Sequence, residues 1–286
     1  FGTRLRRGQK RWSKPAVIAH HPLASLGNPV VWQAPNGWVW LFFVVRPGDT
    51  WSTSRIAAKI SKDGARTWSD AFPVTFEAGT MVRGHPIVLR NGDYLLPIYH
   101  ETGSDPEFTA PDTTALFLRY EPATNRWSES ARIRARLGAL QPAVVELAEN
   151  HLLAFCRRGG DYNPATNAFI VRSESRDNGR TWSPGEDTEF PNPNAAIELL
   201  RLRNGHLLLV YNDSMSERTP LRLAVSTDGG RTFPHRRNLA EGPGDFAYPV
   251  ARQTRDGKIH VVFTSDERTV IRHAVLAEEA ILRHQR

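Results

Sequence analysis

An eight-residue stretch recurs along the chain and decides the fold. Ser61-Lys62-Asp63-Gly64-Ala65-Arg66-Thr67-Trp68 returns as residues 175–182 and 226–233, and each copy keeps serine, aspartate, arginine, threonine and an aromatic residue at the same offsets. Weaker copies end at Trp12 and Trp127. The five aromatic positions are therefore separated by 56, 59, 55 and 51 residues. A period of this length indicates one repeated supersecondary unit rather than a unique arrangement of elements.

A second series alternates with the first. A polar or aromatic residue precedes proline at Asn28, His85, Gln141 and Tyr248, and Asn194 falls where a fifth member is due. Each member leads into an apolar run, a turn and a second apolar run. The turns Asn36-Gly37, Asn91-Gly92, Asn204-Gly205 and Asp256-Gly257 predict two-residue hairpins, because both central positions of such a loop need φ > 0. Proline as a first strand residue removes no ladder hydrogen bond.

Each repeat is thus expected to form a four-stranded antiparallel sheet, and radial repetition of such sheets makes a β-propeller. We expect an all-β chain with six blades and a single domain spanning residues 1–286. Residues 1–20 would supply only the third and fourth strands of the first blade, which is therefore incomplete. Five blades is the alternative.

Composition excludes several function classes. The net charge is +7, but 32 of the 37 basic residues are arginines scattered along the chain, so we expect no nucleic-acid partner. No apolar stretch approaches the roughly 20 residues of a membrane helix. The single cysteine, Cys156, excludes an internal disulfide framework and a cysteine-cluster metal site.

Neither a cofactor nor a metal is expected, since no group of histidines and carboxylates has ligand spacing. Compartment and oligomeric state are not decided by the sequence, although a secreted or periplasmic location is slightly favoured.

The repeats resemble the Asp-boxes, or BNR repeats, of the sialidase superfamily, over nearly the whole chain. In that family the aspartate accepts backbone N–H bonds across a tight turn, glycine takes φ > 0 and the aromatic packs between blades. The boxes lie on the propeller face away from the active site. The resemblance therefore implies that Asp63, Asp177 and Asp228 are structural.

Sialidases bind the substrate carboxylate with three arginines, because a guanidinium matches a planar carboxylate with two parallel hydrogen bonds. A tyrosine activated by a glutamate is their nucleophile, and an aspartate is the acid/base. By resemblance, Arg157 matches the second arginine, Arg218 the third and Tyr248 the nucleophile.

The chain departs from this pattern at Gln141, which stands where the family has its glutamate. Glutamine can hydrogen-bond a tyrosine hydroxyl but cannot take its proton. The first arginine, in an Arg-Ile-Pro sequence, and the aspartate have no match, and the resemblance would place both ahead of Phe1.

Other polar residues belong to the same end of the blades. His85 and the pair His100-Glu101 flank one predicted hairpin, and a histidine beside a carboxylate suits proton transfer near neutral pH. Asn28 and Asn194 suit recognition of sugar hydroxyls and equally suit hydrogen bonds at strand ends. Glu198, four residues into its strand, is a weaker candidate.

Three functions follow as expectations. The first is a glycosidase resembling exo-sialidases that acts on a terminal anionic sugar at the propeller axis. The second is a polysaccharide lyase or uronate-directed glycosidase, with His85 or His100 as base, Tyr248 as acid and Gln141 helping to neutralise the uronate. The third is a propeller that binds glycans or proteins without catalysis.

Overall fold

The computed structural model describes residues 1–6, 8–104, 108–161 and 166–283. Nearly all of the regular structure is antiparallel strand; the exceptions are a 3-10 turn, η1 (Trp51–Thr53), and a four-residue helix, α1 (Glu279–Leu282). The chain divides into two compact units, Phe1–Val82 and Arg83–Arg286. This division does not test the expectation of a single domain, which stays a prediction.

The first unit contains one sheet in sequential order and a hairpin-like N-terminal segment. Gly2 and Ala16 exchange both backbone hydrogen bonds, at 2.8 and 2.9 Å, and the Ser13 N–H donates to the Arg4 carbonyl. Leu41, Phe43 and Ala57 form the core of the sheet. The strands of this unit are β1 (Ser25–Gln33), β2 (Val39–Arg46), β3 (Arg55–Ser61), β4 (Phe72–Pro73) and, after the sheet, β5 (Thr80–Val82).

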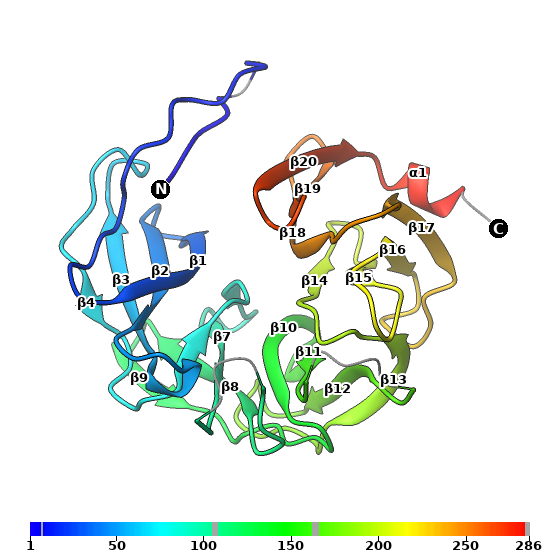
Figure 1. Ribbon diagram of the computed structural model, residues 1–286, viewed down its shortest axis with the longest axis horizontal. Helices are drawn as coiled ribbons and strands as arrows, with labels where there is room; N and C mark the ends of the chain where they lie inside the picture. Colours follow the sequence, from blue (N-terminus) through cyan, green and yellow to red (C-terminus); the bar gives the residue numbers. More distant parts are fainter. Residues whose placement is uncertain (7, 105–107, 162–165, 284–286) are drawn as a thin grey trace. The chain divides into compact units, whose positions relative to one another are not determined.

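The second unit contains four sheets that follow one another along the chain, with β10, β14 and β18 on their inner side (Figure 1). The sheets are β6 (Ile87–Val88), β7 (Tyr94–His100), β8 (Thr114–Glu121) and β9 (Arg126–Glu129); β10 (Ala139–Ala148), β11 (His151–Arg158), β12 (Phe169–Ser175) and β13 (Glu186–Pro191); β14 (Glu198–Arg201), β15 (Leu207–Asn212), β16 (Leu221–Ser226) and β17 (His235–Ala240); and β18 (Ala247–Gln253), β19 (Ile259–Ser265) and β20 (Val270–Leu276).

Runs of consecutive buried residues make both faces of the sheets hydrophobic, because successive side chains point to opposite faces, so neighbouring sheets of the second unit pack face to face. One cluster joins β10–β13 to β14–β17 through Phe155, Phe190, Tyr211 and Phe233. Two further clusters join the sheets on either side in the same way. This packing leaves the ends of the inner strands to carry polar side chains.

The fold is the expected all-β propeller type, with five blades, so the alternative number is the one confirmed. One blade lies in the first unit and four in the second. Gly2 and Ala16 form a single isolated bridge where two outer strands were expected, and the described residues ahead of β1 form no further sheet.

The Asp-box turns have the expected structure. The Asp177 carboxylate accepts the Arg180 and Thr181 backbone N–H groups at 3.0 and 2.9 Å, while Ser175 and Thr181 donate their hydroxyls to it. Trp182 stacks on Phe117 of the preceding blade, with ring centroids 4.4 Å apart. The three aspartates are thus held within their own turns, and the aromatic residue joins two blades.

The hairpin turns differ from the expectation. At Asn36-Gly37 the Gly37 N–H donates to the Ala34 carbonyl, the Ala34 N–H donates to the Trp38 carbonyl, and of the two central residues only Gly37 has a positive φ, 85°. Gly92, Gly205 and Gly257 repeat this pattern. The loops therefore have three residues, a type I turn followed by a left-handed glycine. In each of these loops the residues that precede the glycine, which are proline or polar, adopt the type I turn with negative φ.

Candidate functional site

A repeated backbone bend presents side chains at the start of the inner strands. In β10 the pairing with β11 is interrupted between Leu140 and Ala143, and in β18 the pairing with β19 is interrupted between Ala247 and Val250. Gln141 and Tyr248 occupy these bulges with φ of 49° and 54°. A bulge re-aims a side chain, and proline is tolerated there because no ladder bond needs its missing N–H.

Asn194, ahead of β14, has the same left-handed conformation with φ of 54°, although alanine rather than proline follows it. Such conformations cost about 1–3 kcal/mol for residues other than glycine, and they persist where surrounding contacts impose them, often at functional sites. Asn28 in β1 shares the bend, with φ of 47°, and is half-buried in the first unit. Its expected contact with sugar hydroxyls stays a prediction.

Arg157, near the end of β11, is the centre of the cluster in the second unit. It is 3% exposed, and it donates from Nε to Asn194 Oδ1 at 2.7 Å and from Nη1 to Gln141 Oε1 at 3.2 Å. The Gln141 amide nitrogen in turn donates to the Tyr99 hydroxyl at 3.4 Å. Gln141 and Asn194 are neutral amides, so neither of these two contacts cancels the charge of Arg157.

Asn194 has both ends of its amide engaged. Its nitrogen donates to the carbonyls of Gly160 and Asp161, and its oxygen accepts from Arg157. It is fully buried. Asn194 therefore orients Arg157, and its expected contact with a sugar stays a prediction. The neighbouring Arg158 donates to three backbone carbonyls, those of Asn192, Gly159 and Asp161.

Tyr248 lies beside two arginines. The Arg218 guanidinium carbon is 5.4 Å from the centroid of the Tyr248 ring, and Arg218 is within hydrogen-bonding reach of the phenol. Arg218 also donates to the Asn194 carbonyl at 3.3 Å. Burial raises the pKa of Tyr248, but the charges of Arg157 and Arg218 outweigh it and lower the pKa below its ordinary value. The phenolate is therefore favoured relative to a tyrosine in water.

Glu101, directly after β7, is a buried carboxyl of the same cluster. Burial raises the pKa of Glu101 to about 7, against the opposing charge of Arg157. A group with a pKa near neutrality is suited to both giving and taking a proton. Successive side chains of a strand point to opposite faces, so Tyr99 and half-buried His100 diverge. The proton-transfer roles expected of His100 and Glu101 stay predictions.

A second group of charges surrounds Glu198, which is 3% exposed. Its carboxylate contacts Arg252 at 2.9 Å, His85 Nδ1 at 3.7 Å and Arg83 at 3.8 Å. Burial raises the pKa of Glu198, but Arg252, His85 and Arg83 together lower it to about 2. Burial and the Arg252 charge lower the pKa of His85, so His85 is neutral at pH 7.

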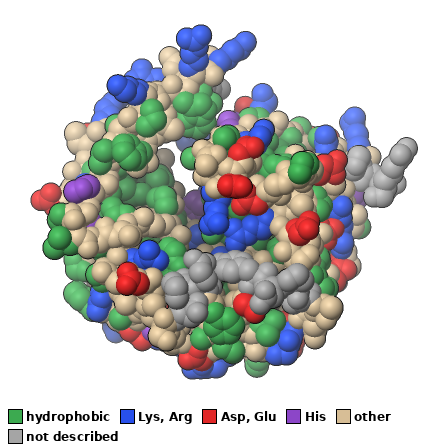
Figure 2. Space-filling model, in the orientation of Figure 1, with side chains coloured by type: hydrophobic (Ala, Val, Ile, Leu, Met, Phe, Trp, Pro, Cys, Tyr) green, Lys and Arg blue, Asp and Glu red, His purple; other side chains and the backbone are tan. Residues whose placement is uncertain are grey.

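The second unit therefore gathers more positive than negative charge around Tyr248. Arg157 and Arg218 lower the pKa of Tyr248, and Arg83 interacts electrostatically with both Tyr248 and Glu198. Arg252 pairs with the ionised Glu198, while Glu101 titrates near neutrality. Figure 2 shows basic side chains gathered on the face where Figure 1 labels β10 and β14. Such a cluster favours an anionic ligand.

Sequence reasoning missed Arg83, Tyr99 and Arg252. Arg83 precedes His85-Pro86 by two residues, so its place ahead of an inner strand was a usable signal. Tyr99 could have been found as a polar aromatic residue near the end of a second strand, the position that Arg157 has in the next blade. Arg252 lies late in β18 and carries no such signal.

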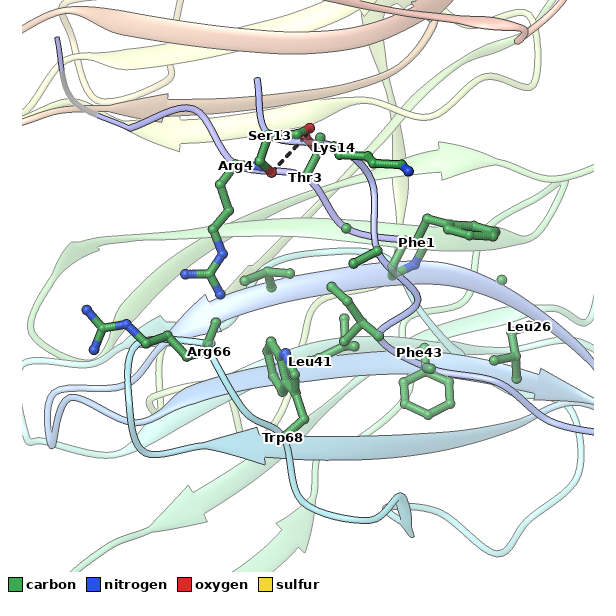
Figure 3. Close-up of a pocket in the computed structure, with 18 of the residues that line it drawn as sticks. Phe1, Thr3, Arg4, Ser13, Lys14, Leu26, Leu41, Phe43, Arg66 and Trp68 are labelled. Carbon is green, nitrogen blue, oxygen red and sulfur yellow. Dashed lines mark hydrogen bonds between the residues drawn. The ribbon is translucent and has the colours of Figure 1, made fainter. Parts of the chain in front are cut away.

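A cavity of about 760 Å³ lies in the first unit between the N-terminal segment and the sheet (Figure 3). Leu41, Phe43 and Trp68 line its apolar side, and Arg4 and Arg66 are among the basic residues at its other side. None of the candidate residues of the second unit contributes to it.

Within the described ranges no three histidine, cysteine or acidic side chains gather as metal ligands would. The same part of the chain contains no helix long and apolar enough to span a membrane.

Comparisons with known proteins show the same fold in several solved structures. The chain is similar in structure to the Hadza microbial sialidase Hz136, with 18% identity, a TM-score of 0.78 and coverage of 98% of this chain and 59% of that one. It is also similar to the NanB sialidase of Streptococcus pneumoniae (13% identity, TM-score 0.76, coverage 98% and 63%). A third similar structure is the intramolecular trans-sialidase of Ruminococcus gnavus (13%, 0.74, 98% and 88%).

At these identities the likeness shows the fold alone, and the chain spans about three fifths of the length of Hz136 and NanB. No curated protein sequence matches the chain. The family model of the BNR repeat-like domain, however, matches residues 2–261, which is most of the sequence. The chain therefore belongs to the BNR repeat-like domain family and has the sialidase type of β-propeller fold.

Proposed function

We propose that this protein is a glycoside hydrolase of the sialidase-like class, acting on a terminal anionic sugar bound by the second unit. The observation that carries the proposal is the environment of Tyr248, which lies next to Arg218 and within the field of Arg157. The fold is that of solved sialidases, which supports the same reading.

Arg157 and Arg218 would bind the carboxylate of the sugar. Arg157 is suited to this because the hydrogen bonds to Gln141 and Asn194 orient the guanidinium through neutral amides. A buried, pre-oriented guanidinium loses little conformational entropy when a carboxylate binds. This arrangement gives the glutamine at position 141 a role that a glutamate could not fill.

Tyr248 would be the nucleophile. Its phenolate oxygen forms a bond to the anomeric carbon while the glycosidic C–O bond breaks, and protonated Glu101 gives its proton to the departing oxygen. Water then attacks the same carbon, ionised Glu101 takes its proton, and the Tyr248 oxygen leaves. Gln141 cannot take the phenol proton, so Tyr248 loses it to solvent under the influence of the two arginines.

A uronate-directed lyase is the second candidate, because Gln141 and His85 are both neutral at pH 7. In this reading His85 takes the proton next to the uronate carboxylate, the glycosidic C–O bond breaks as a C=C bond forms, and Tyr248 protonates the departing oxygen. Arg157 and Gln141 would stabilise the charge on the carboxylate.

The products separate these functions. We would incubate the protein with a fluorogenic sialoside and, in parallel, with uronate oligosaccharides. Release of free sialic acid supports the proposal, and ultraviolet absorbance from an unsaturated uronate supports elimination instead. Calorimetric binding of sialic acid or glucuronate without turnover would leave only a binding propeller. If neither sugar acid binds, the anionic-sugar proposal is wrong.

A further inference from the structure

We propose that Arg83 is a positioning residue that holds Tyr248 in its reactive place by bonding the backbone beside it. This inference rests on the proposed function of Tyr248. It assigns to Arg83 a role different from that of the clamp arginines, Arg157 and Arg218.

Arg83 donates hydrogen bonds to the backbones of two neighbouring blades. Its Nη2 donates to the carbonyl of Pro249 at 2.7 Å, and its Nη1 donates to the carbonyl of Ile197 at 3.1 Å. Pro249 follows Tyr248 directly, and Ile197 lies three residues after Asn194, the partner of Arg157. The Arg83 guanidinium therefore contacts the backbone next to Tyr248 and the segment that carries Asn194, the partner of Arg157.

The Pro249 carbonyl lies where the strand ladder is interrupted. Pairing of β18 with β19 stops at Ala247 and resumes at Val250, so the ladder does not hold the bend between them. Tyr248 adopts its left-handed conformation within this bend, at φ of 54°. Strained backbone persists only where contacts impose it. A charge-assisted bond from Arg83 is such a contact, since it is about twice as strong as a neutral one.

The charge of Arg83 is compensated inside the protein. Its Nη1 lies 3.8 Å from Glu198, and Arg252 and His85 hold that carboxylate in place. Burial lowers the pKa of Arg83 and Glu198 raises it. A sugar carboxylate would have to compete with Glu198 and with two backbone carbonyls for this guanidinium. The contacts therefore suit positioning better than direct binding of an anionic sugar.

Another buried arginine provides a matched control. Arg119 is 3% exposed, donates to the Asn178 carbonyl at 2.6 Å and pairs with Asp93. Like Arg83 it joins a backbone carbonyl and a carboxylate, but its partners belong to an Asp-box turn and a hairpin. Arg119→Lys and Arg83→Lys thus make the same chemical change at opposite ends of the blades.

The experiment compares Arg83→Lys, Arg83→Ala and Arg119→Lys in the full chain. We expect Arg83→Lys to lower kcat about 100-fold, as a small misplacement of a reacting group does, with KM changed less than about threefold. Added guanidinium should restore part of the lost kcat of Arg83→Ala. Arg119→Lys should lower Tm to a similar extent and leave kcat unchanged.

A readout without substrate separates this inference from the proposed function. The ionisation of Tyr248 is followed by ultraviolet difference titration, with Tyr248→Phe as the reference. Arg83→Lys should shift this ionisation and Arg119→Lys should not, even if the protein turns over no sugar. The inference fails if Arg83→Lys leaves the ionisation unchanged, if its loss of kcat matches only its unfolded fraction, or if KM alone rises, which would make Arg83 a clamp residue.

Discussion

The two ends of the blades use repetition in opposite ways. At the Asp-box end, both side chain and backbone repeat: the serine hydroxyl donates to the aspartate at 2.8 Å in all three full copies, and the N–H four residues after the serine donates back to that hydroxyl at 2.8 Å in all three. Each turn satisfies its own polar groups.

At the inner-strand end, only the backbone repeats. Asn28, Gln141, Asn194 and Tyr248 share a left-handed conformation with φ between 47° and 54°, yet they carry three kinds of side chain. In the second unit, Gln141 and Asn194 contact Arg157, and Tyr248 contacts Arg218. The difference teaches that identical side chains on a repeated backbone maintain the fold, whereas varied side chains on a repeated backbone mark the site.

The largest expected effect is at Arg157. Arg157→Ala removes the guanidinium between Gln141 and Asn194, and we expect kcat/KM to fall about 1,000-fold, the size of effect seen when one partner of a buried charged contact is truncated. Circular dichroism should show an intact fold. Arg136→Ala, which removes an exposed arginine paired with Asp187, is the control and should retain turnover. Wild-type turnover by folded Arg157→Ala would remove the clamp from the mechanism.

A smaller effect is expected at Gln141. Gln141→Glu places a carboxylate against Arg157, so we expect KM for an anionic sugar to rise about 10- to 100-fold as the ion pair competes with the substrate. Gln253→Glu makes the same change where the amide oxygen accepts the Arg203 N–H, and it should leave KM unchanged. Unchanged or improved KM in Gln141→Glu would show that the neutral amide is not what preserves the clamp.

The pH dependence should report Glu101. Burial raises the pKa of Glu101 to about 7, so kcat/KM should fall as pH rises through 7 and the proton donor is lost. Because this folded-state pKa lies above the ordinary value of 4.5, the stability that protonated Glu101 contributes is complete below pH 4.5 and is lost as pH rises through 7. In Glu101→Gln both dependences should disappear. A pH–rate limb that survives in Glu101→Gln belongs to another group.

The smallest effect on activity is expected at the other end of the blades. Asp177→Ala removes the acceptor of the Asp-box bonds, and we expect unfolding to become about 2 kcal/mol easier while kcat/KM stays within about twofold of wild type. Hydrogen bonds from Thr181 and Ser175 outweigh burial and lower the pKa of Asp177. Its contribution is therefore present above pH 3.8 and is lost as pH falls below that. Impaired turnover at full folding would contradict the division of roles.

Much of the fold and part of the site could be predicted from sequence because both repeat. The Asp-box offsets predict the turns and the inter-blade aromatic contacts. The residues before proline predict roughly where the inner strands begin, but not the bulges that present Gln141 and Tyr248, because proline was expected to open each strand and lies inside β10 and β18 instead. The location of Arg83 ahead of an inner strand carried a signal, but its contacts could not be predicted, because its carbonyl partners lie 114 and 166 residues away. Nor could the raised pKa of Glu101, which depends on the burial of this carboxyl in the folded protein.

The left-handed bulge has a consequence for engineering. Gln141 and Tyr248 adopt the same left-handed bend, each within an interrupted ladder and before a proline, so one backbone shape accepts both a glutamine and a tyrosine side chain. Each bulge is thus a position at which the side chain can differ while the backbone conformation is kept. A library of variants at these bulge positions alone could change the ligand that the propeller accepts while leaving its blades and their packing untouched.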